Sequence, residues 1–267
     1  MQLFDSLTHI TADGSWMGER RYDASLGRLL REMDAAGVGR ACLVTIADHG
    51  DNDVTMAAAR AHPQRFVPIA GLNPRPLPTL RRVEAAVADI AAQGFAGIKL
   101  HPRLNGYDPL DEKCIALIDA AAKHDIVIFL DTLFRRKGLS TRHAPDVIDY
   151  LAAACPDTRM VLLHGTGPTI MELYEIVRCN DHLILDLSFT IMRYRGSERL
   201  DADMRFLFQT TDQLVTIGSD FPEYSPAEML ERFRQLTAGI EPHRIDNITH
   251  KNLERLFASY SVPELQT

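Results

Sequence analysis

The sequence predicts an α/β protein built as a (β/α)8 barrel of the TIM type. Short β-branched runs alternate with helical stretches eight times along the 267 residues. No linker or low-complexity segment interrupts the series, and a doubly wound sheet usually has only five or six strands. Since one such barrel typically uses about 250 residues, we expect residues 1–267 to form a single domain.

The first four pairs of a strand and a helix are predicted from apolar runs and from the residues that end them. Leu26, Leu29, Leu30 and Met33 are spaced by three and four residues, which predicts one helical face ended by Gly37. We expect strands over Gln2–Phe4, Arg40–Ile46, Phe66–Gly71 and Phe95–Leu100, and helices over 26–36, Asn52–Ala61, Thr79–Ala92 and Leu110–Lys123.

The last four units repeat the same rhythm. We expect strands over Ile126–Leu130, Arg159–Leu163, His182–Leu187 and Leu214–Ile217, and helices over Ala144–Ala154, Thr169–Val177, Glu198–Gln209 and Ala227–Leu236. An additional C-terminal helix over Lys251–Ser259 carries Leu253, Leu256 and Phe257 on one face, and we expect it to pack outside the barrel.

Composition restricts the partners. The net charge is −7 and no basic stripe stands against it, which argues against nucleic acid. No run approaches the roughly 18 apolar residues of a membrane span, and the N-terminus lacks a signal-peptide pattern. Neither GxGxxG after the first strand nor a P-loop is present. We expect a cytoplasmic protein that acts on a small molecule, with a homodimer as the most common oligomer for soluble enzymes.

Ionisable residues end six of the eight predicted strands. In a barrel of this kind the carboxyl ends of the strands build the working face, so these side chains should converge in one mouth. Imidazoles, carboxylates and a lysine are the groups that bind a divalent cation or relay protons. The strand ends carry Asp5 and His9, Lys99 and His101, Asp131, His164, Asp186 and Ser188, and Asp220.

Several motifs, in order along the whole chain, resemble the amidohydrolase superfamily, in its amidohydrolase-related branch. They are Asp5-x-x-Thr-His9, Gly97-Ile-Lys-Leu-His-Pro102, Met160-Val-Leu-Leu-His-Gly165, Gly218-Ser-Asp-Phe-Pro222 and Asn247-Ile-x-x-x-Asn252-x-x-Arg-Leu-Phe257. The resemblance implies a (β/α)8 enzyme that uses a divalent metal, usually zinc, to activate water. It also implies hydrolysis of an amide, lactone or related bond, while some relatives decarboxylate aromatic acids.

The chain departs from the family pattern at two ligand positions. Leu7 stands where the first histidine of a His-x-His pair is expected, and Asp131 stands where the strand-five histidine is expected. The metal ligands that the resemblance implies are therefore His9, Asp131 and Asp220. Two carboxylates and one imidazole accept Mn²⁺ or Mg²⁺ as well as Zn²⁺. Because Leu7 removes a ligand, a site without metal is the alternative.

Three functions follow as hypotheses. In the first, a hydrolase uses a metal-bound water, Asp220 takes its proton, and His164 or Lys99 stabilises the oxyanion. In the second, Lys99, His101, His164 and Asp220 act without metal, as in a lactonase or a decarboxylase of the same family. In the third, the barrel only binds a small molecule.

Substrate contacts are expected from the loops after the strands. His101, Arg103, Ser188 and Trp16 are the candidates, with Trp16 in the irregular segment Thr11–Arg21 that we expect to act as a lid. Arg103, Arg135 and Arg136 are placed to clamp a carboxylate. With Tyr107, Phe134 and Tyr194 they suggest an aromatic, basic mouth suited to a small organic anion.

Overall fold

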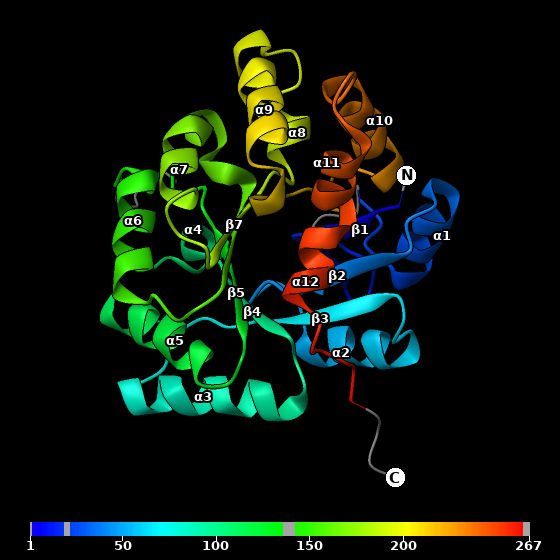
Figure 1. The fold of residues 1–267 in the computed structure, drawn as a ribbon. Coiled ribbons are helices and arrows are strands. Elements are labelled where there is room, and N and C mark those ends of the chain that lie inside the picture. The colour runs from blue at the N-terminus through cyan, green and yellow to red at the C-terminus, as the bar shows by residue number, and fades with distance from the viewer. Residues whose placement is uncertain (1, 19–21, 136–141, 264–267) are drawn as a thin grey trace.

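Eight parallel strands lie side by side in sequence order, each paired with the next, and helices surround them (Figure 1). The structure is a computed structural model that describes residues 2–18, 22–135 and 142–263. This arrangement confirms the predicted (β/α)8 barrel. The strands are β1 (Phe4–Thr8), β2 (Arg40–Val44), β3 (Phe66–Gly71), β4 (Gly97–Leu100), β5 (Val127–Asp131), β6 (Met160–Leu163), β7 (Leu183–Asp186) and β8 (Val215–Thr216).

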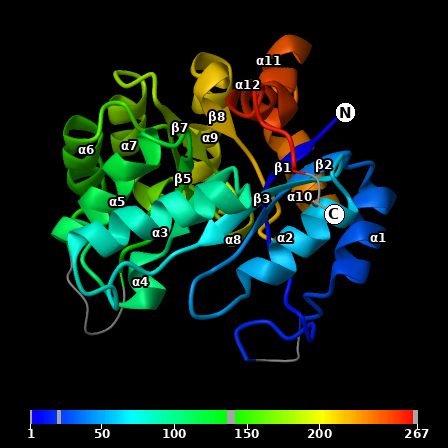
Figure 2. The same cartoon turned by 90° about the horizontal axis from the view of Figure 1, so that it is seen from below.

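The long helices form the outer ring, seen from below in Figure 2. They are α1 (Leu26–Ala36), α2 (Asn52–Ala61), α3 (Leu80–Gln93), α5 (Glu112–Ala122), α6 (Ala144–Ala154), α7 (Ile170–Val177), α9 (Glu198–Thr210) and α10 (Pro226–Leu236). Short helical segments lie in the loops and near the C-terminus: α4 (Pro102–Asn105), η1 (His164–Thr169), α8 (Thr190–Arg193), η2 (Asp212–Leu214), α11 (Pro242–Asp246), η3 (Asn247–Lys251) and α12 (Asn252–Leu256).

Local signals explain most of the helix limits. The Ser25 side chain accepts a hydrogen bond from the Arg28 amide and starts α1, and Gly37 ends it in the left-handed conformation that glycine adopts without strain. Ser225 and Glu228 form a reciprocal capping box at the start of α10. These caps account for the close agreement between the predicted and observed helices.

The first strand was predicted too early. It runs over Phe4–Thr8 rather than Gln2–Phe4, because the buried polar residues Asp5 and Thr8 also pair with β2. Buried polar side chains hid this strand from an apolar pattern. The β1–β2 register shifts between Asp5 and Thr8, so a simple alternation of inward and outward residues does not hold there.

Alternating residues divide the barrel interior into an apolar part and a polar mouth. Along β5, Val127 and Phe129 belong to the apolar interior, and Asp131, two residues further on, lies at the mouth. In β4, Lys99 is buried above Gly97, whose added Cβ would lie 2.6 Å from the Val127 carbonyl oxygen. Because alternate side chains of a strand lie on the same face, Lys99 and Asp131 both lie inside the barrel near the carboxyl ends of their strands.

Hydrogen bonds outside a regular ladder join β1 to β8. The Ser6 amide donates to Ile217 (3.2 Å), the Asp220 amide to Leu7 (3.0 Å) and the His9 amide to Phe221 (2.9 Å). Gly218 lies at this junction, where a Cβ would approach the Leu7 amide nitrogen to 2.7 Å. The junction thus sets the backbone of His9 against that of Asp220.

The C-terminal helix covers the end of the barrel opposite the carboxyl ends of the strands. The observed helix α12 is shorter than predicted, and a π-helical turn, η3, precedes it. Leu253 and Leu256 join the apolar interior, and the Phe257 ring lies 6.3 Å from that of Phe4 and 6.4 Å from that of Phe129. The prediction that this helix packs outside the barrel is wrong, because its apolar face covers the open end of the strands.

No helix among the described residues is long and apolar enough to cross a membrane.

Ionisation of Asp5 makes the stability of the β1–β8 junction depend on pH. Its buried Oδ1 accepts hydrogen bonds from the amides of Leu7 (3.1 Å) and Ser219 (2.9 Å), and Oδ2 has no hydrogen-bond partner in the described part of the chain. Burial raises the pKa of Asp5 from 3.8 to about 7, although the bonds to Ser219 and Leu7 oppose the rise. The folded state therefore prefers the protonated carboxyl.

We predict that Asp5→Asn removes a pH-dependent loss of stability. A raised folded-state pKa stabilises the fold fully below pH 3.8, and this contribution is lost as the pH rises through about 7. Asparagine keeps an acceptor and does not ionise, so its free energy of unfolding relative to wild type should rise by several kcal/mol from pH 4 to 8, at about 1.4 kcal/mol per pKa unit. Urea denaturation at each pH measures the difference; a pH-independent difference contradicts the prediction.

Candidate active site

A cavity of about 380 Å³ opens at the carboxyl ends of the strands. Eight of the nine residues predicted for the site line it: His9, Trp16, Lys99, His101, Arg103, Asp131, His164 and Asp220. The remaining lining residues are Met17, Ile46, His49, Leu104, Leu133, Phe189 and Glu223. Residues more than 200 positions apart in the sequence thus meet in one mouth.

Ser188 does not line this cavity. It is fully buried, its hydroxyl and amide both donate to the Asp186 carboxylate, and its carbonyl accepts from Nδ1 of His164 at 2.9 Å. The predicted role in substrate binding therefore gives way to a role in positioning His164.

His9 and Asp220 form the first of two charged groups in the cavity. His9 Nδ1 lies 2.6 Å from the Val44 carbonyl oxygen, which only accepts, so Nδ1 carries the proton. Burial lowers the pKa of His9, so the ring is neutral and Nε2 presents a lone pair. Nε2 lies 3.5 Å from Asp220 Oδ1. Two proton acceptors therefore face each other at the cavity wall.

Asp131 is the centre of the second group. Its Oδ2 lies 3.2 Å from His101 Nε2, 3.3 Å from His164 Nε2 and 3.9 Å from an Arg103 nitrogen. Burial opposes ionisation of Asp131, but these neighbours hold its pKa well below the usual range. Burial likewise lowers the pKa of His101, to about 3. Asp131 is therefore a carboxylate and His101 is neutral.

His164 carries a proton that its carboxylate partner stabilises. Burial alone lowers its pKa, but contact with Asp131 outweighs burial and places the pKa above the usual value. Because Nδ1 donates to Ser188, the additional proton lies on Nε2, toward Asp131. Of the imidazoles of His9, His101 and His164, that of His164 is therefore protonated, and the other two are neutral.

Lys99 brings a buried positive charge to the cavity. Its side chain is 2% exposed. Burial lowers the pKa of the ammonium, and the carboxylates of Asp131 and Asp220 oppose that fall. A desolvated cation between two carboxylates is costly to bury and acts strongly on a developing negative charge.

Two of the ionisable site residues have positive φ angles. His164 has φ 67° and Asp220 has φ 57°, a region that residues other than glycine seldom occupy. Each such residue costs about 1–3 kcal/mol and persists only where its surroundings enforce it. At His164 the turn out of β6 breaks the alternation after Leu163, and it directs the ring into the cavity.

The predicted metal ligands do not form one cluster. Asp131 contacts His101 and His164, whereas His9 contacts Asp220, and the described residues include no group of three or more His, Cys, Asp or Glu side chains suited to a metal ion. Leu7 is packed in the apolar interior. The positive charge of Lys99 interacts with both aspartates, so it opposes the binding of a second cation beside them. The donor set does not fit a metal, and we derive no step through one.

The sequence did not identify several residues that complete the site. Asp186 accepts hydrogen bonds from Ser6, from Ser188 and from the His164 amide (3.4 Å), and so supports the His164 turn. Asp186 was recognised only as a polar strand end.

Trp16 covers His9. The two rings stack with centroids 4.9 Å apart, and the Trp16 indole donates to Glu223 at 3.2 Å. Trp16 therefore forms a wall of the cavity, as the predicted lid requires, although residues 19–21 of the lid lie outside the described residues. Glu223 carries no sequence signal beyond its place after β8.

The chain belongs to the amidohydrolase family, because the family model Amidohydro_2, described as amidohydrolase, matches residues 17–257. A comparison with curated proteins gives no significant match.

Solved structures share the fold. An uncharacterised TIM-barrel protein from Bordetella bronchiseptica has 21% identity and a TM-score of 0.81, over 97% of this chain and 99% of that one. A probable 2-pyrone-4,6-dicarboxylic acid hydrolase from Acinetobacter baumannii, with citric acid bound, has 15% identity and a TM-score of 0.69, over 97% and 100%. An amidohydrolase from Burkholderia multivorans with bound zinc has 16% identity and a TM-score of 0.72, over 97% and 99%. Dihydroxybenzoate decarboxylases share the architecture as well.

We predict that Asp131→Asn lowers the pKa of His164. The substitution removes the anion that stabilises the protonated ring, while burial remains, so the pKa should fall from above 6.5 to below it. NMR titration of the imidazole nitrogens measures this shift. Asp146→Asn, which alters a carboxylate beside His143 instead, is the control. An unchanged His164 titration in Asp131→Asn would refute the assignment.

Proposed function

We propose that the protein is a hydrolase of lactones or similarly activated esters of a small organic acid, working through Lys99 and the His9–Asp220 pair. The observation that carries the proposal is the position of a buried ammonium and two facing proton acceptors on the same cavity. The family consists of enzymes that include hydrolases and decarboxylases, which supports a catalytic role.

Water activation is assigned to His9 and Asp220. Nε2 of neutral His9 and Oδ1 of ionised Asp220 both accept protons, and their separation of 3.5 Å lets one water donate to both. Burial opposes ionisation of Asp220, but the positive charges of His164 and Lys99 keep its pKa low. Asp220 takes the proton as the water attacks the carbonyl carbon.

Stabilisation of the oxyanion is assigned to Lys99. Attack converts the carbonyl oxygen to an alkoxide, and a preorganised cation in a dry site lowers the free energy of that state. As the tetrahedral intermediate collapses, the ring oxygen of a lactone leaves and takes up a proton. We assign this proton to protonated His164, which lines the same cavity and whose pKa is raised by contact with Asp131.

Activated esters suit this machinery better than amides. An amide nitrogen is a poor leaving group, and the proposed bases, His9 and Asp220, are weak. A pyrone ring is a lactone, so the likeness in fold to a probable 2-pyrone-4,6-dicarboxylic acid hydrolase agrees with the proposed class.

Decarboxylation is the second candidate. A carbanion left by loss of carbon dioxide needs a proton, and protonated His164 on the cavity wall is a suitable donor. Carbon dioxide release from dihydroxybenzoates distinguishes this reaction from lactone opening, which releases none.

We predict that Asp220→Asn lowers lactone turnover by about 10²–10⁴-fold, the usual loss when a general base is removed. Asparagine has the size of aspartate, so the fold should be retained. Initial rates with a panel of small aromatic lactones measure the effect, and circular dichroism checks the fold. Asp119→Asn, which changes an exposed carboxylate that does not line the cavity, is the control. A fully active Asp220→Asn enzyme refutes the role of Asp220.

We further predict that turnover survives chelation. Since the described ligands form no metal cluster, enzyme dialysed against EDTA should keep its rate, and added Zn²⁺ or Mn²⁺ should not increase it. Elemental analysis of the same samples records the bound metal. Activity that disappears with EDTA and returns with Zn²⁺ would overturn the proposed mechanism.

A further inference from the structure

A second cavity, of about 450 Å³, adjoins the reaction cavity at the mouth of the barrel. The two share Arg103, Leu133 and Phe189 as lining residues. A molecule held beside Lys99 therefore has room to extend past Phe189 into this second space, which we call the annex.

The annex is lined by cations and by no carboxylate among the described residues. Arg103, Arg135, Arg142 and Arg193 border it, from the loops after β4, β5 and β7 and from the start of α6. Arg103 and Arg142 already have partners: Asp131 lies 3.9 Å from Arg103, and Asp108 lies 2.9 Å from Arg142. Within the described residues, Arg135 and Arg193 make no ion pair, so their charge is not locally compensated.

Two helices begin at the annex. His143 is the residue before α6 and Thr169 is the residue before α7, and neither side chain caps its helix. The amide ends of helices carry partial positive charge and bind anions. Asp146 and Glu172, in the first turns, instead contact the His143 ring at 3.3 Å and 3.1 Å, and neither lines the annex.

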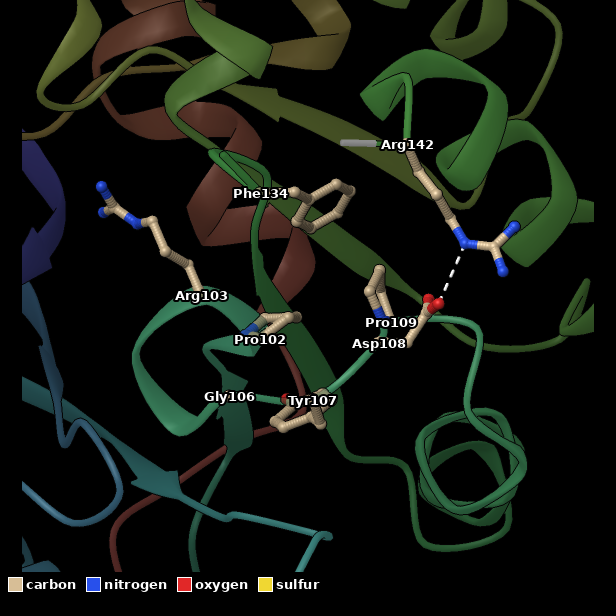
Figure 3. Close-up of a pocket in the computed structure, with 8 residues that line it drawn as sticks. All are labelled: Pro102, Arg103, Gly106, Tyr107, Asp108, Pro109, Phe134 and Arg142. Atoms are coloured by element: carbon tan, nitrogen blue, oxygen red, sulfur yellow. Dashed lines mark hydrogen bonds and ion pairs between the residues drawn. The ribbon is translucent and has the colours of Figure 1, made fainter. Parts of the chain in front are cut away.

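Aromatic side chains complete the walls. Phe134, Phe189 and Tyr194 line the annex beside the arginines. Figure 3 shows the smaller recess that adjoins it, where Phe134 lies between Arg103 and Arg142, and Arg142 is turned toward Asp108. An aromatic or otherwise apolar linker fits against these rings, and arginine forks bind planar or tetrahedral oxyanions in bidentate fashion.

We infer that the annex binds an oxyanion group, a phosphoryl or carboxylate group, at the end of the substrate remote from the reacting bond. This inference rests on the proposed function, because it takes the reacting group to lie at Lys99 and Asp220. It narrows the substrate to an extended anion that spans both cavities. Arg135 and Arg193 supply the uncompensated charge, and Phe189 separates the two ends.

Binding of small probes tests the annex without any turnover. We expect wild type to bind phenyl phosphate or benzoate in calorimetry, and not phenol, which lacks the anionic group. Arg135→Gln/Arg193→Gln should weaken the anion at least about tenfold, since a charge-assisted hydrogen bond contributes about 1.5–3 kcal/mol. Both arginines are exposed, so the fold should be retained; each single variant provides a second test with a smaller loss.

A matched double variant controls for net charge. Arg195→Gln/Arg199→Gln removes two exposed arginines that do not line the annex and should bind the probes as wild type does. Tighter binding of phenyl phosphate identifies a phosphoryl group, and equal or tighter binding of benzoate identifies a carboxylate. The inference is overturned if wild type binds neither anion, or if the two double variants lose affinity equally.

The variant Asp220→Asn separates this inference from the proposed function. It should bind the anions with wild-type affinity although its turnover is lost, because Asp220 does not line the annex. If probes bind but no lactone is opened, the annex stands and the hydrolase proposal fails. If lactones are opened but no probe binds, the hydrolase proposal stands and the annex inference fails.

Discussion

The junction between β1 and β8 is the constraint on which the rest of the site depends. No regular ladder joins these strands, and individual hydrogen bonds through Ser6, Leu7 and His9 close the barrel instead. The same bonds fix His9 beside Asp220 and force Asp220 into a left-handed conformation. The hydrogen bonds that close the barrel therefore also position Asp220, the proposed general base, and maintain its strained backbone conformation.

Charge burial organises the site around this junction. Lys99, Asp131 and Asp220 are all withdrawn from water at the mouth, and the Lys99 ammonium and the two carboxylates offset part of the cost of burying the opposite charge. Below them an apolar cluster of the interior extends down to Phe257. The polar residues that the barrel interior does contain, Asp186 with its serine partners, hold His164 in place rather than face the cavity.

A barrel of this family without an assembled ligand cluster raises the question of what supplies positive charge to the reaction. Leu7 is an apolar side chain at a position where the family resemblance implies a metal ligand, and Asp131 already contacts two imidazoles. Among the described residues, the reaction cavity is lined by the cations Lys99, Arg103 and protonated His164, and the annex arginines extend the positive region outward. Chemistry directed at an anionic, activated ester follows from that distribution of charge.

The sequence by itself determined the order of strands and helices, because apolar period and capping residues are local signals. It also determined most of the site, since strand ends in a barrel converge; eight of nine predicted residues line one cavity. Only the tertiary structure showed which ionisable side chains of the site contact one another. Whether Asp131 meets His9 or His164 depends on side-chain directions across strands and on the left-handed turn at His164. For the same reason only the fold showed that Ser188 lies behind the site and that α12 closes the barrel, since both follow from contacts between residues far apart in the chain.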